Sequence, residues 1–297
     1  MSLVNPQLRQ AIRECMGGYR SSVRPRGIHA DAHFETLLHQ LFDSARSVEY
    51  FIKLRERDIS AKRSDPNSNE FDPIRSATAY LHAGDVDEAA WLIFLSIHFG
   101  IHRRTRWQLV RETYGALGSG RTWDWKTART NPEQLLHWLS KNHKNLSGQF
   151  GNHRKYVSLK PKVRGGTGEA FKSYLQWIQK YSSHTQMLAS FKQRVGAERG
   201  DLFNAIYNEM RKSVRSFGRT GCFDYLCALG KLDAFPVEPS SPYIPGSTGP
   251  RIGAELLLAG TRTKKLRPQY LDQQMQELGN RLADCGVRFA MQVLEDA

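Results

Sequence analysis

The sequence has no apolar run long enough to cross a membrane, and its first ten residues, MSLVNPQLRQ, lack the apolar core of a secretory signal. Cysteine is scarce, with four among 297 residues. The closest two, Cys222 and Cys227, are not spaced like ligands of a zinc or iron–sulfur site. We therefore expect a cytoplasmic protein with reduced cysteines, no metal and no cofactor.

Acidic residues are also few, with 29 Asp and Glu against 43 Lys and Arg, which gives a formal net charge of +14 at pH 7. Such a charge favours a polyanionic partner. Nucleic acid is the first candidate and an anionic membrane surface the second. Because no predicted helix combines a basic face with an exposed apolar one, we expect no membrane partner. We expect a monomer whose partner is double-stranded DNA.

The basic charge is concentrated in one long segment. Residues 134–168 contain no Asp or Glu, and all six tryptophans lie between Trp91 and Trp177, interleaved with the basic residues. The basic residues of the segment are Lys141, Lys144, Arg154, Lys155, Lys160, Lys162 and Arg164. Basic side chains that contact phosphates, with aromatic rings that stack on bases, suit nucleic-acid binding. For any single tryptophan, a place in an aromatic core is the favoured alternative.

Hydrophobic residues recur at helical spacing, and no segment alternates like a strand, so the sequence predicts an all-α fold. Asp85 precedes an apolar helix over 86–99 as a candidate N-cap, and a final helix begins near Pro268. Its buried stripe is predicted to run from Leu271 to Phe289. The other helices are predicted over 29–53, 106–117, 132–141, 167–181, 202–217 and 252–259, with a loop over 55–72.

The segment IPGSTGPRIGAELLL, residues 244–258, raises the question of a phosphate-binding turn. It resembles the hairpin of the helix-hairpin-helix DNA glycosylases, the superfamily of endonuclease III. In that family a Leu-Pro-Gly-x-Gly turn opens a helix whose first amides hold the DNA backbone. The resemblance implies backbone contacts here by Gly246, Ser247, Gly249 and Arg251. A plain loop that only changes the chain direction is the alternative.

The same family places an aspartate at the start of the next long helix, and Asp272 stands at that position. The resemblance implies that Asp272 is the catalytic carboxylate, which stabilises positive charge on the sugar or orients the attacking water. A helix-start acid that only favours the helix dipole is the alternative. Nearby Lys264 and Lys265 are predicted phosphate contacts.

Two further segments follow in the order of the family. Residues 92–98, LIFLSIH, resemble a helix that lines the base pocket, which implies base contacts by Ser96 and His98, with Phe99 and Trp91 beside them. Residues 151–159, GNHRKYVSL, resemble a helix start with a backbone-binding lysine. This resemblance implies phosphate contacts by Lys155 and Arg154. For His98, a buried core histidine is the alternative.

Departures from the family pattern shape the expected chemistry. Arg251 occupies the position of the lysine that forms a Schiff base in some glycosylases, and an arginine stays protonated, so we expect a monofunctional enzyme without lyase activity. The iron–sulfur cysteines are absent. A long insert over 166–240 separates the Lys155 segment from the hairpin. This version of the pattern, with a long insert and a histidine at position 98, looks most like the α-glutamyl/putrescinyl thymine pyrophosphorylase family, a glycosylase-like branch linked to hypermodified phage DNA.

The resemblance implies a helix-hairpin-helix glycosylase-like fold with two helical subdomains and a cleft between them. We expect four segments: an N-terminal helical region (1–84), a bundle with the base-pocket helix (85–165), a helical insert (166–240), and the hairpin with the catalytic helix (241–297).

The first functional hypothesis is a DNA glycosylase that flips a hypermodified or glucosylated pyrimidine and hydrolyses its N-glycosidic bond, with a role in defence against phage. The alternatives are a biosynthetic enzyme of the same fold that modifies thymine in DNA, and a non-catalytic DNA-binding protein.

Overall fold

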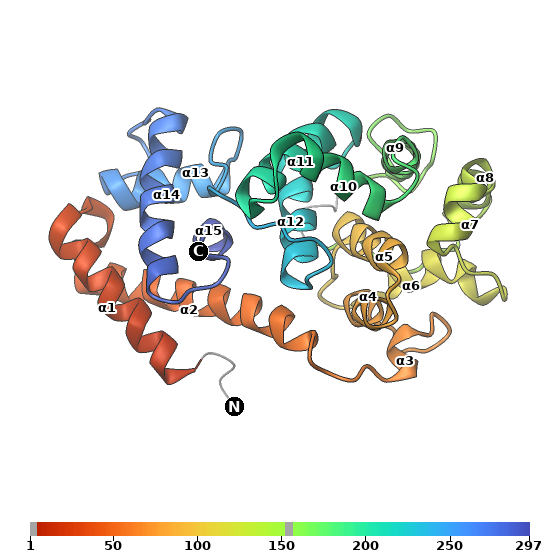
Figure 1. Cartoon of the computed structure of the whole chain (residues 1–297), viewed down its shortest axis with the longest axis horizontal. Coiled ribbons are helices and arrows are strands. Elements are labelled where there is room, and N and C mark those ends of the chain that lie inside the picture. Colours follow the sequence, from red (N-terminus) through yellow and green to blue (C-terminus); the bar gives the residue numbers. More distant parts are fainter. Residues whose placement is uncertain (1–4, 152–156) are drawn as a thin grey trace. The chain divides into compact units, whose positions relative to one another are not determined.

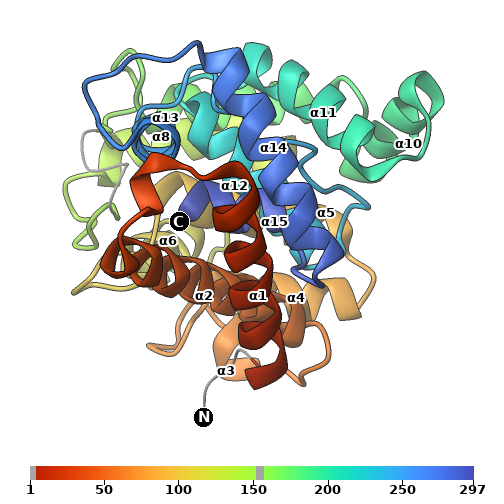
Figure 2. The ribbon, with the colours of Figure 1, turned by 90° about the vertical axis from the view of Figure 1, so that its left-hand side faces the viewer.

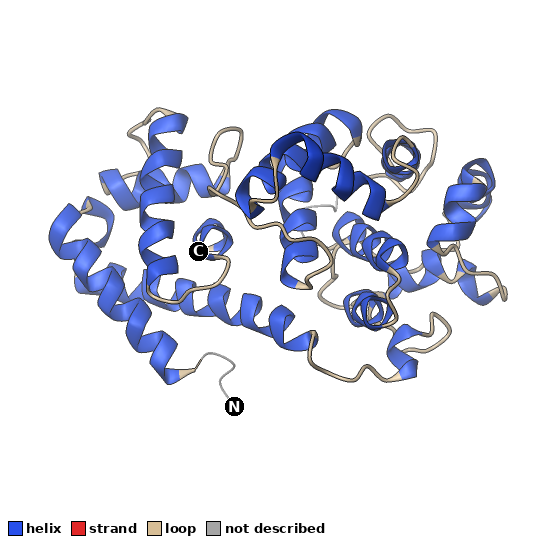
Figure 3. Cartoon of the chain, viewed as in Figure 1, coloured by secondary structure: helices blue, strands red, loops and turns tan. Residues whose placement is uncertain are grey.

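The computed structural model describes residues 5–151 and 157–297. Over these residues the chain forms fifteen α-helices and two short 3-10 helices, and it contains no β-strand (Figure 3). An isolated bridge joins His102 and Arg106. The prediction of an all-α protein is therefore confirmed. None of the described helices is both long and apolar enough to cross a membrane.

The chain divides into two compact units, each with its own set of helices. Unit 1 joins the two ends of the chain, Met1–Lys53 and Glu238–Ala297, and unit 2 is the continuous stretch Leu54–Val237. Of the predicted segment boundaries, those at 84 and 165 fall inside unit 2, and the one at 240 lies close to the second junction.

Unit 1 is built around the predicted stripe of the last long helix. Helices α1 and α14 lie side by side (Figures 1 and 2), and the side chains of Leu271, Leu278 and Leu282 on α14 are fully buried. They belong to one hydrophobic core with Ile12 and Leu38, among others. Its elements are α1 (Pro6–Val23), η1 (Arg26–Ile28), α2 (Asp31–Leu54), α13 (Gly249–Ala259), α14 (Pro268–Asp284) and α15 (Ala290–Asp296).

The predicted final helix is shorter than expected. Helix α14 ends at Asp284, and the chain then turns through Gly286, whose φ of +87° is a left-handed conformation that favours glycine. Helix α15 follows as a separate element. Phe289 is buried, but it lies before α15 with a positive φ and not on one continuous stripe with Leu271. The helical spacing of Phe289 in the sequence was therefore accidental.

Gly27 sets how closely α13 approaches η1, and its replacement gives the first test. A Cβ at this position would lie 2.1 Å from the carbonyl oxygen of Leu256 and 2.7 Å from the Cα of Leu257. Because both are backbone atoms, Gly27→Ala must displace α13, and we expect a loss of about 1–3 kcal/mol in the free energy of unfolding. Urea denaturation measures this loss.

Gly17→Ala is the matched control for Gly27→Ala. Gly17 lies within α1, where an added Cβ meets no atom within 4 Å. An alanine in the interior of a helix is favoured over glycine, so this variant should be at least as stable as the wild type. Equal stability of the two variants would contradict the close contact at Gly27.

Unit 2 surrounds helix α5, whose exposed surface is almost nil. Asp85 caps this helix as predicted, because its side chain accepts a hydrogen bond from the amide of Glu88. Helix α5 packs against α4, α12 and α10 (Figure 1), and its apolar residues occupy all faces, as expected for a central helix. The elements of unit 2 are α3 (Ala61–Ser64), α4 (Pro73–His82), α5 (Val86–Phe99), α6 (Gln108–Tyr114), η2 (Ala116–Gly118), α7 (Trp125–Thr130), α8 (Pro132–Asn142), α9 (Thr167–Gln179), α10 (His184–Val195), α11 (Arg199–Ser213) and α12 (Gly218–Lys231).

Candidate functional site

The predicted hairpin is a tight, exposed turn that leads directly into α13. The carbonyl oxygen of Ile244 accepts hydrogen bonds from the amide and the hydroxyl of Ser247, at 2.9 and 2.7 Å. Pro245 and Gly246 occupy the two central positions, and the φ of +80° at Gly246 matches the requirement of a type II turn. No regular helix directly precedes this turn, since α12 ends at Lys231 and residues 236–243 form no helix.

The turn leaves room for a close approach to the backbone. A Cβ added at Gly246 or Gly249 would meet no atom within 4 Å, and both residues are exposed. No side chain caps the first amides of α13. Free amides at the start of a helix, combined with an unobstructed backbone, suit a phosphate ligand.

Arg251 and Lys265 both lie beside one buried carboxylate, although the Lys265 side chain itself is 65% exposed. The Arg251 guanidinium lies 3.2 Å from Oε1 of Glu255, and Lys265 Nζ lies 3.9 Å from Oε2 of the same residue. The Glu255 side chain is fully buried, so this acid holds both cations beside α13. Lys264 is exposed and makes no ion pair among the described residues.

Asp272 joins the two motifs on which the family resemblance depends. Its Oδ1 accepts a hydrogen bond of 2.7 Å from the amide of Ile244, which is 28 residues away in the sequence. Its Oδ2 has no hydrogen-bond partner among the described residues, and the side chain is half-buried. One carboxylate oxygen is thus fixed against the turn, while the other is available to a substrate.

An exposed aromatic side chain, which the sequence reasoning missed, lies on the same helix as this carboxylate. Tyr270 stands two residues before Asp272 on α14, and it is 48% exposed. A tyrosine this exposed beside the basic residues 262–267 can stack on a base or a sugar. The signal in the sequence was the position of an aromatic residue off the buried stripe of α14.

The four predicted base contacts lie inside the core of unit 2. Trp91, His98 and Phe99 have no exposed surface, and Ser96 is 2% exposed. Their polar atoms have internal partners: the Trp91 indole donates to the carbonyl oxygen of Trp123, and the Ser96 hydroxyl to that of Ile93. His98 Nε2 lies 3.1 Å from the hydroxyl of Thr167. Contact between a base and these side chains stays a prediction, and it requires unit 2 to open at this point.

The remaining predicted phosphate contacts belong to the acid-free segment. Arg154 and Lys155 lie outside the described residues. Gly151 donates its amide to the carbonyl oxygen of Phe99, at 2.8 Å, and no helix begins within residues 157–166. Two cavities, of about 390 and 590 Å³, are lined partly by the acid-free segment and partly by residues before it. His102 and Gln149 line both cavities. The basic contributors are Arg103 and Arg104 to the first, and Lys144 and Lys160 to the second.

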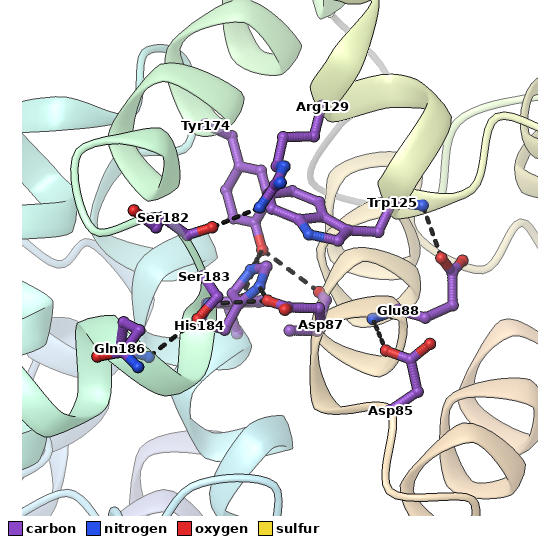
Figure 4. A network of polar contacts seen from close by, with 12 residues as sticks. Asp85, Asp87, Glu88, Trp125, Arg129, Tyr174, Ser182, Ser183, His184 and Gln186 are labelled. Carbon is purple, nitrogen blue, oxygen red and sulfur yellow. Dashed lines mark hydrogen bonds and ion pairs between the residues drawn. The ribbon is translucent and has the colours of Figure 1, made fainter.

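A buried chain of polar groups, which the sequence reasoning also missed, connects α5 to α10 (Figure 4). Asp87 Oδ1 accepts hydrogen bonds from the amide and the Nδ1 of His184, at 2.8 and 2.5 Å. His184 Nε2 lies 2.6 Å from the Tyr174 hydroxyl, which in turn lies 2.8 Å from that of Tyr225. Since a carboxylate only accepts, Nδ1 carries the imidazole proton, and the donor direction is Tyr225 to Tyr174 to His184 to Asp87.

The protonation states of Asp87 and His184 follow from their burial and from the contact between them. Burial lowers the pKa of His184 below its ordinary value, against the opposing effect of Asp87. For Asp87, burial alone would raise the pKa, but the hydrogen bonds from His184 and the positive charge of Arg129 outweigh it and hold the pKa low. At neutral pH we therefore assign a neutral imidazole and an ionised Asp87.

A second buried acid, Glu88, lies on the neighbouring side of α5 (Figure 4). Its two oxygens accept hydrogen bonds from the Tyr114 hydroxyl at 2.7 Å and from the Trp125 amide at 2.6 Å. Burial nevertheless raises the pKa of Glu88 to about 7. The folded protein therefore binds this proton more tightly than the unfolded chain does.

This raised pKa predicts a specific pH dependence of stability. The stabilisation from Glu88 is fully present below its ordinary pKa of 4.5 and is lost as the pH rises through about 7. Glu88→Gln cannot titrate at this position. When the pH is lowered from 8 to 5, the difference in the free energy of unfolding between the wild type and this variant should therefore shift by about 2–3 kcal/mol in favour of the wild type. Denaturation curves at several pH values measure the difference. Glu198→Gln, at an exposed position, should show a constant difference, and a constant difference for Glu88→Gln would refute the raised pKa.

No group of three or more His, Cys, Asp and Glu residues in the described part of the chain is arranged to hold a metal ion. The candidate-site residues described above offer a carboxylate and cationic groups. Asp272 supplies the carboxylate in unit 1, and lysines and arginines supply positive charge in both units.

The sequence matches the family model of the alpha-glutamyl/putrescinyl thymine pyrophosphorylases, clade 3, over residues 32–297. The chain therefore belongs to this family, in agreement with the family that the sequence motifs resemble most. The description of the family concerns thymine modification, so it agrees better with the biosynthetic alternative than with base excision. No curated protein and no solved structure matches the chain.

Proposed function

We propose that this protein modifies thymine bases in DNA by joining an amine to the carbon attached to C5 of the base, with release of pyrophosphate. The observation that carries the proposal is the family match over residues 32–297. Its description combines two substituents, glutamyl and putrescinyl, with pyrophosphorylase chemistry. Glutamate and putrescine both carry an amine, so one nucleophilic group accounts for both names.

The proposed step is a displacement at a methylene carbon that bears a diphosphate ester. The amine nitrogen forms a bond to this carbon while the bond from the carbon to the diphosphate oxygen breaks. The electron pair of that bond leaves with pyrophosphate, and the proton of the amine passes to a general base. Cationic groups that stabilise the charge on the leaving group lower the barrier.

Asp272 is the proposed general base. Its Oδ1 is fixed by the Ile244 amide, and its Oδ2 is available to accept the proton of the amine. A carboxylate held in this way is already oriented before the substrate arrives, which reduces the entropic cost of the step. The arrangement assigns Ile244 a positioning role only.

We further propose that the hairpin holds the DNA backbone, as in the helix-hairpin-helix glycosylases. Gly246, Gly249 and the first amides of α13 would contact a phosphate, with Ser247 buried beneath them as the support of the turn. Arg251, Lys264 and Lys265 would supply positive charge beside it. The formal net charge of +14 supports a DNA partner for the whole chain.

The test uses a DNA duplex with one thymine whose methyl carbon carries a diphosphate ester. The duplex is incubated with the protein and isotope-labelled glutamate or putrescine, and released pyrophosphate and label incorporated in the DNA are both counted. The proposal predicts equal amounts of the two. A duplex with a hydroxymethyl group in place of the diphosphate is the control, and it should give neither product.

Two other outcomes would overturn the proposal. Abasic sites without incorporated label would indicate base excision. Salt-sensitive DNA binding with no chemical change in the DNA would indicate a binding protein.

A further inference from the structure

Unit 2 contains a cavity of about 630 Å³ at the connection between α11 and α12, in a part of the chain to which no role has been assigned above. Its basic lining residues are Arg211, Lys212, Arg215 and Arg219, and no acidic residue lines it. Phe217 also lines the cavity. A cavity walled by cations without acids is suited to an anion that carries more than one charge.

The segment that lines this cavity contains no acidic residue. Residues 210–223 contain no Asp or Glu. Among the described residues, Arg211, Lys212 and Arg215 form no ion pair with a carboxylate. The acid that precedes them in the sequence, Glu209, accepts hydrogen bonds from Trp177 and Tyr181 and pairs with Arg194.

Arg219 differs from the other three basic residues because it is built into the protein. It is 7% exposed, and its guanidinium lies over the Phe223 ring, 5.2 Å from the centroid. A buried arginine that lines a cavity is restrained before a ligand binds, so less side-chain entropy is lost on binding than at an exposed lysine.

The backbone adds further donors on the same side. Ser216 and Gly218 have positive φ values of 61° and 64°, with Phe217 at −87° between them. Successive amides in such alternating conformations converge on one point and favour an anion. Gly218 also begins α12, a 14-residue helix without a side-chain N-cap, so its first amides are not occupied by a capping oxygen.

The cavity is connected to a residue that the sequence pattern predicted to contact a base. The Phe217 ring stacks on Phe94 at 4.9 Å and lies parallel to the His98 ring at 6.5 Å, measured between centroids. A ligand in this cavity is thus separated from the predicted base pocket by one aromatic ring.

We propose that the α11–α12 cavity is a binding site for a diphosphate group. The identity of the ligand rests on the proposed function, whereas the presence of a phosphate site rests on the cavity itself. A diphosphate brings several negative charges to one place, while a backbone phosphate of DNA brings one. The four cations around one cavity match the first ligand better. The cavity belongs to unit 2, and Asp272 belongs to unit 1.

The test compares two double variants of the full-length protein by calorimetric titration with inorganic pyrophosphate. Arg211→Gln with Arg215→Gln removes two cavity charges, and Lys180→Gln with Lys192→Gln removes two exposed charges elsewhere in unit 2. The first should weaken pyrophosphate binding by about tenfold or more, because charge-assisted hydrogen bonds are lost. The second should bind like the wild type.

An unmodified DNA duplex titrated against the same proteins separates the two sources of phosphate. Equal DNA affinity of the two double variants, together with the selective loss of pyrophosphate binding, supports the diphosphate site. A selective loss of DNA affinity in the cavity variant, with pyrophosphate binding unchanged, would assign the cavity to the DNA backbone and overturn the proposal. Absence of pyrophosphate binding by the wild type, or equal binding by both variants, would also overturn it.

The result is independent of the transfer assay. Pyrophosphate binding lost with the cavity charges, in a protein that transfers no amine, would retain the site and reject the proposed function. Amine transfer by the wild type, with no measurable pyrophosphate binding by the same protein, would retain the proposed function and reject the site.

Discussion

Asp272→Asn is expected to slow amine transfer to the diphosphorylated thymine by about 100-fold or more, because a general base typically contributes a factor of this size. An asparagine keeps a side-chain oxygen that can accept the hydrogen bond from the Ile244 amide, which Asp272 Oδ1 accepts at 2.7 Å. The turn should therefore be retained, while the group that accepts the proton is lost. Initial rates of pyrophosphate release measure the effect.

Two comparisons make the Asp272 prediction specific. DNA affinity should stay close to that of the wild type in Asp272→Asn, since the basic residues around the hairpin are unchanged. Asp284→Asn, an equal change of charge at an exposed position of the same helix, should transfer the amine normally. Full activity in Asp272→Asn would show that this carboxylate only supports the turn, and joint loss of activity and DNA binding would point to a structural role.

Asp87→Ala is expected to lower the free energy of unfolding by about 1–3 kcal/mol, the range expected when a buried hydrogen-bond donor loses its acceptor. The substitution deletes the acceptor of two hydrogen bonds from His184, one from its amide and one from its ring. His184 is fully buried, so its Nδ1–H would have no water to replace the carboxylate. Guanidinium denaturation monitored by tryptophan fluorescence measures the loss.

The matched variant is Asp87→Asn, which keeps an oxygen for these donors and removes the charge. We expect it to lose clearly less stability than Asp87→Ala. The lowered pKa of His184 also predicts that the contribution of this residue to the free energy of unfolding decreases as the pH falls below 6.5, the ordinary value, because acid protonates the imidazole of the unfolded chain more readily. Equal stability of Asp87→Ala and the wild type would contradict a stabilising role of the hydrogen bonds between Asp87 and His184.

Local sequence signals correctly predicted the elements that have clear helix boundaries or one apolar face. Asp85 in front of a continuous apolar stretch identified α5 and its N-cap, and the spacing of Leu271, Leu278 and Leu282 identified the buried face of α14. The Pro245–Gly246 pair predicted a turn because few other residue pairs fit its backbone angles. In each case the information lies within a few residues of the chain.

Helices stabilised by tertiary packing were missed. Helix α12 contains Gly218, Gly221 and Gly230, which lower helix propensity, and most of its residues are buried, so no amphipathic stripe is visible. Helix α1 was missed although Asn5 caps it and Pro6 begins it, because Gly17 and Gly18 lie in its interior. Packing against the rest of each unit overrides these local preferences.

The candidate site could be predicted only in part. The pairing of Asp272 with the turn followed from the order of the family motifs, and the hydrogen bond to Ile244 agrees with it. His184 and Asp87 are 97 residues apart, so no local pattern could bring them together. For Trp91 and His98, the helical spacing was the same for a core residue and for a pocket residue.

The choice between base excision and base modification depends on features that motifs do not encode. A carboxylate beside a phosphate-binding turn can assist hydrolysis of a glycosidic bond or deprotonate an amine. The family description, with its glutamyl and putrescinyl substituents, favours the second reaction.

Mass spectrometry of the nucleosides released from the reacted duplex tests the central claim most directly. The account predicts a nucleoside in which the diphosphate is replaced by the added amine, with the glycosidic bond intact. Loss of the modified base from the DNA, with an abasic site in its place, would contradict the account and establish a glycosylase.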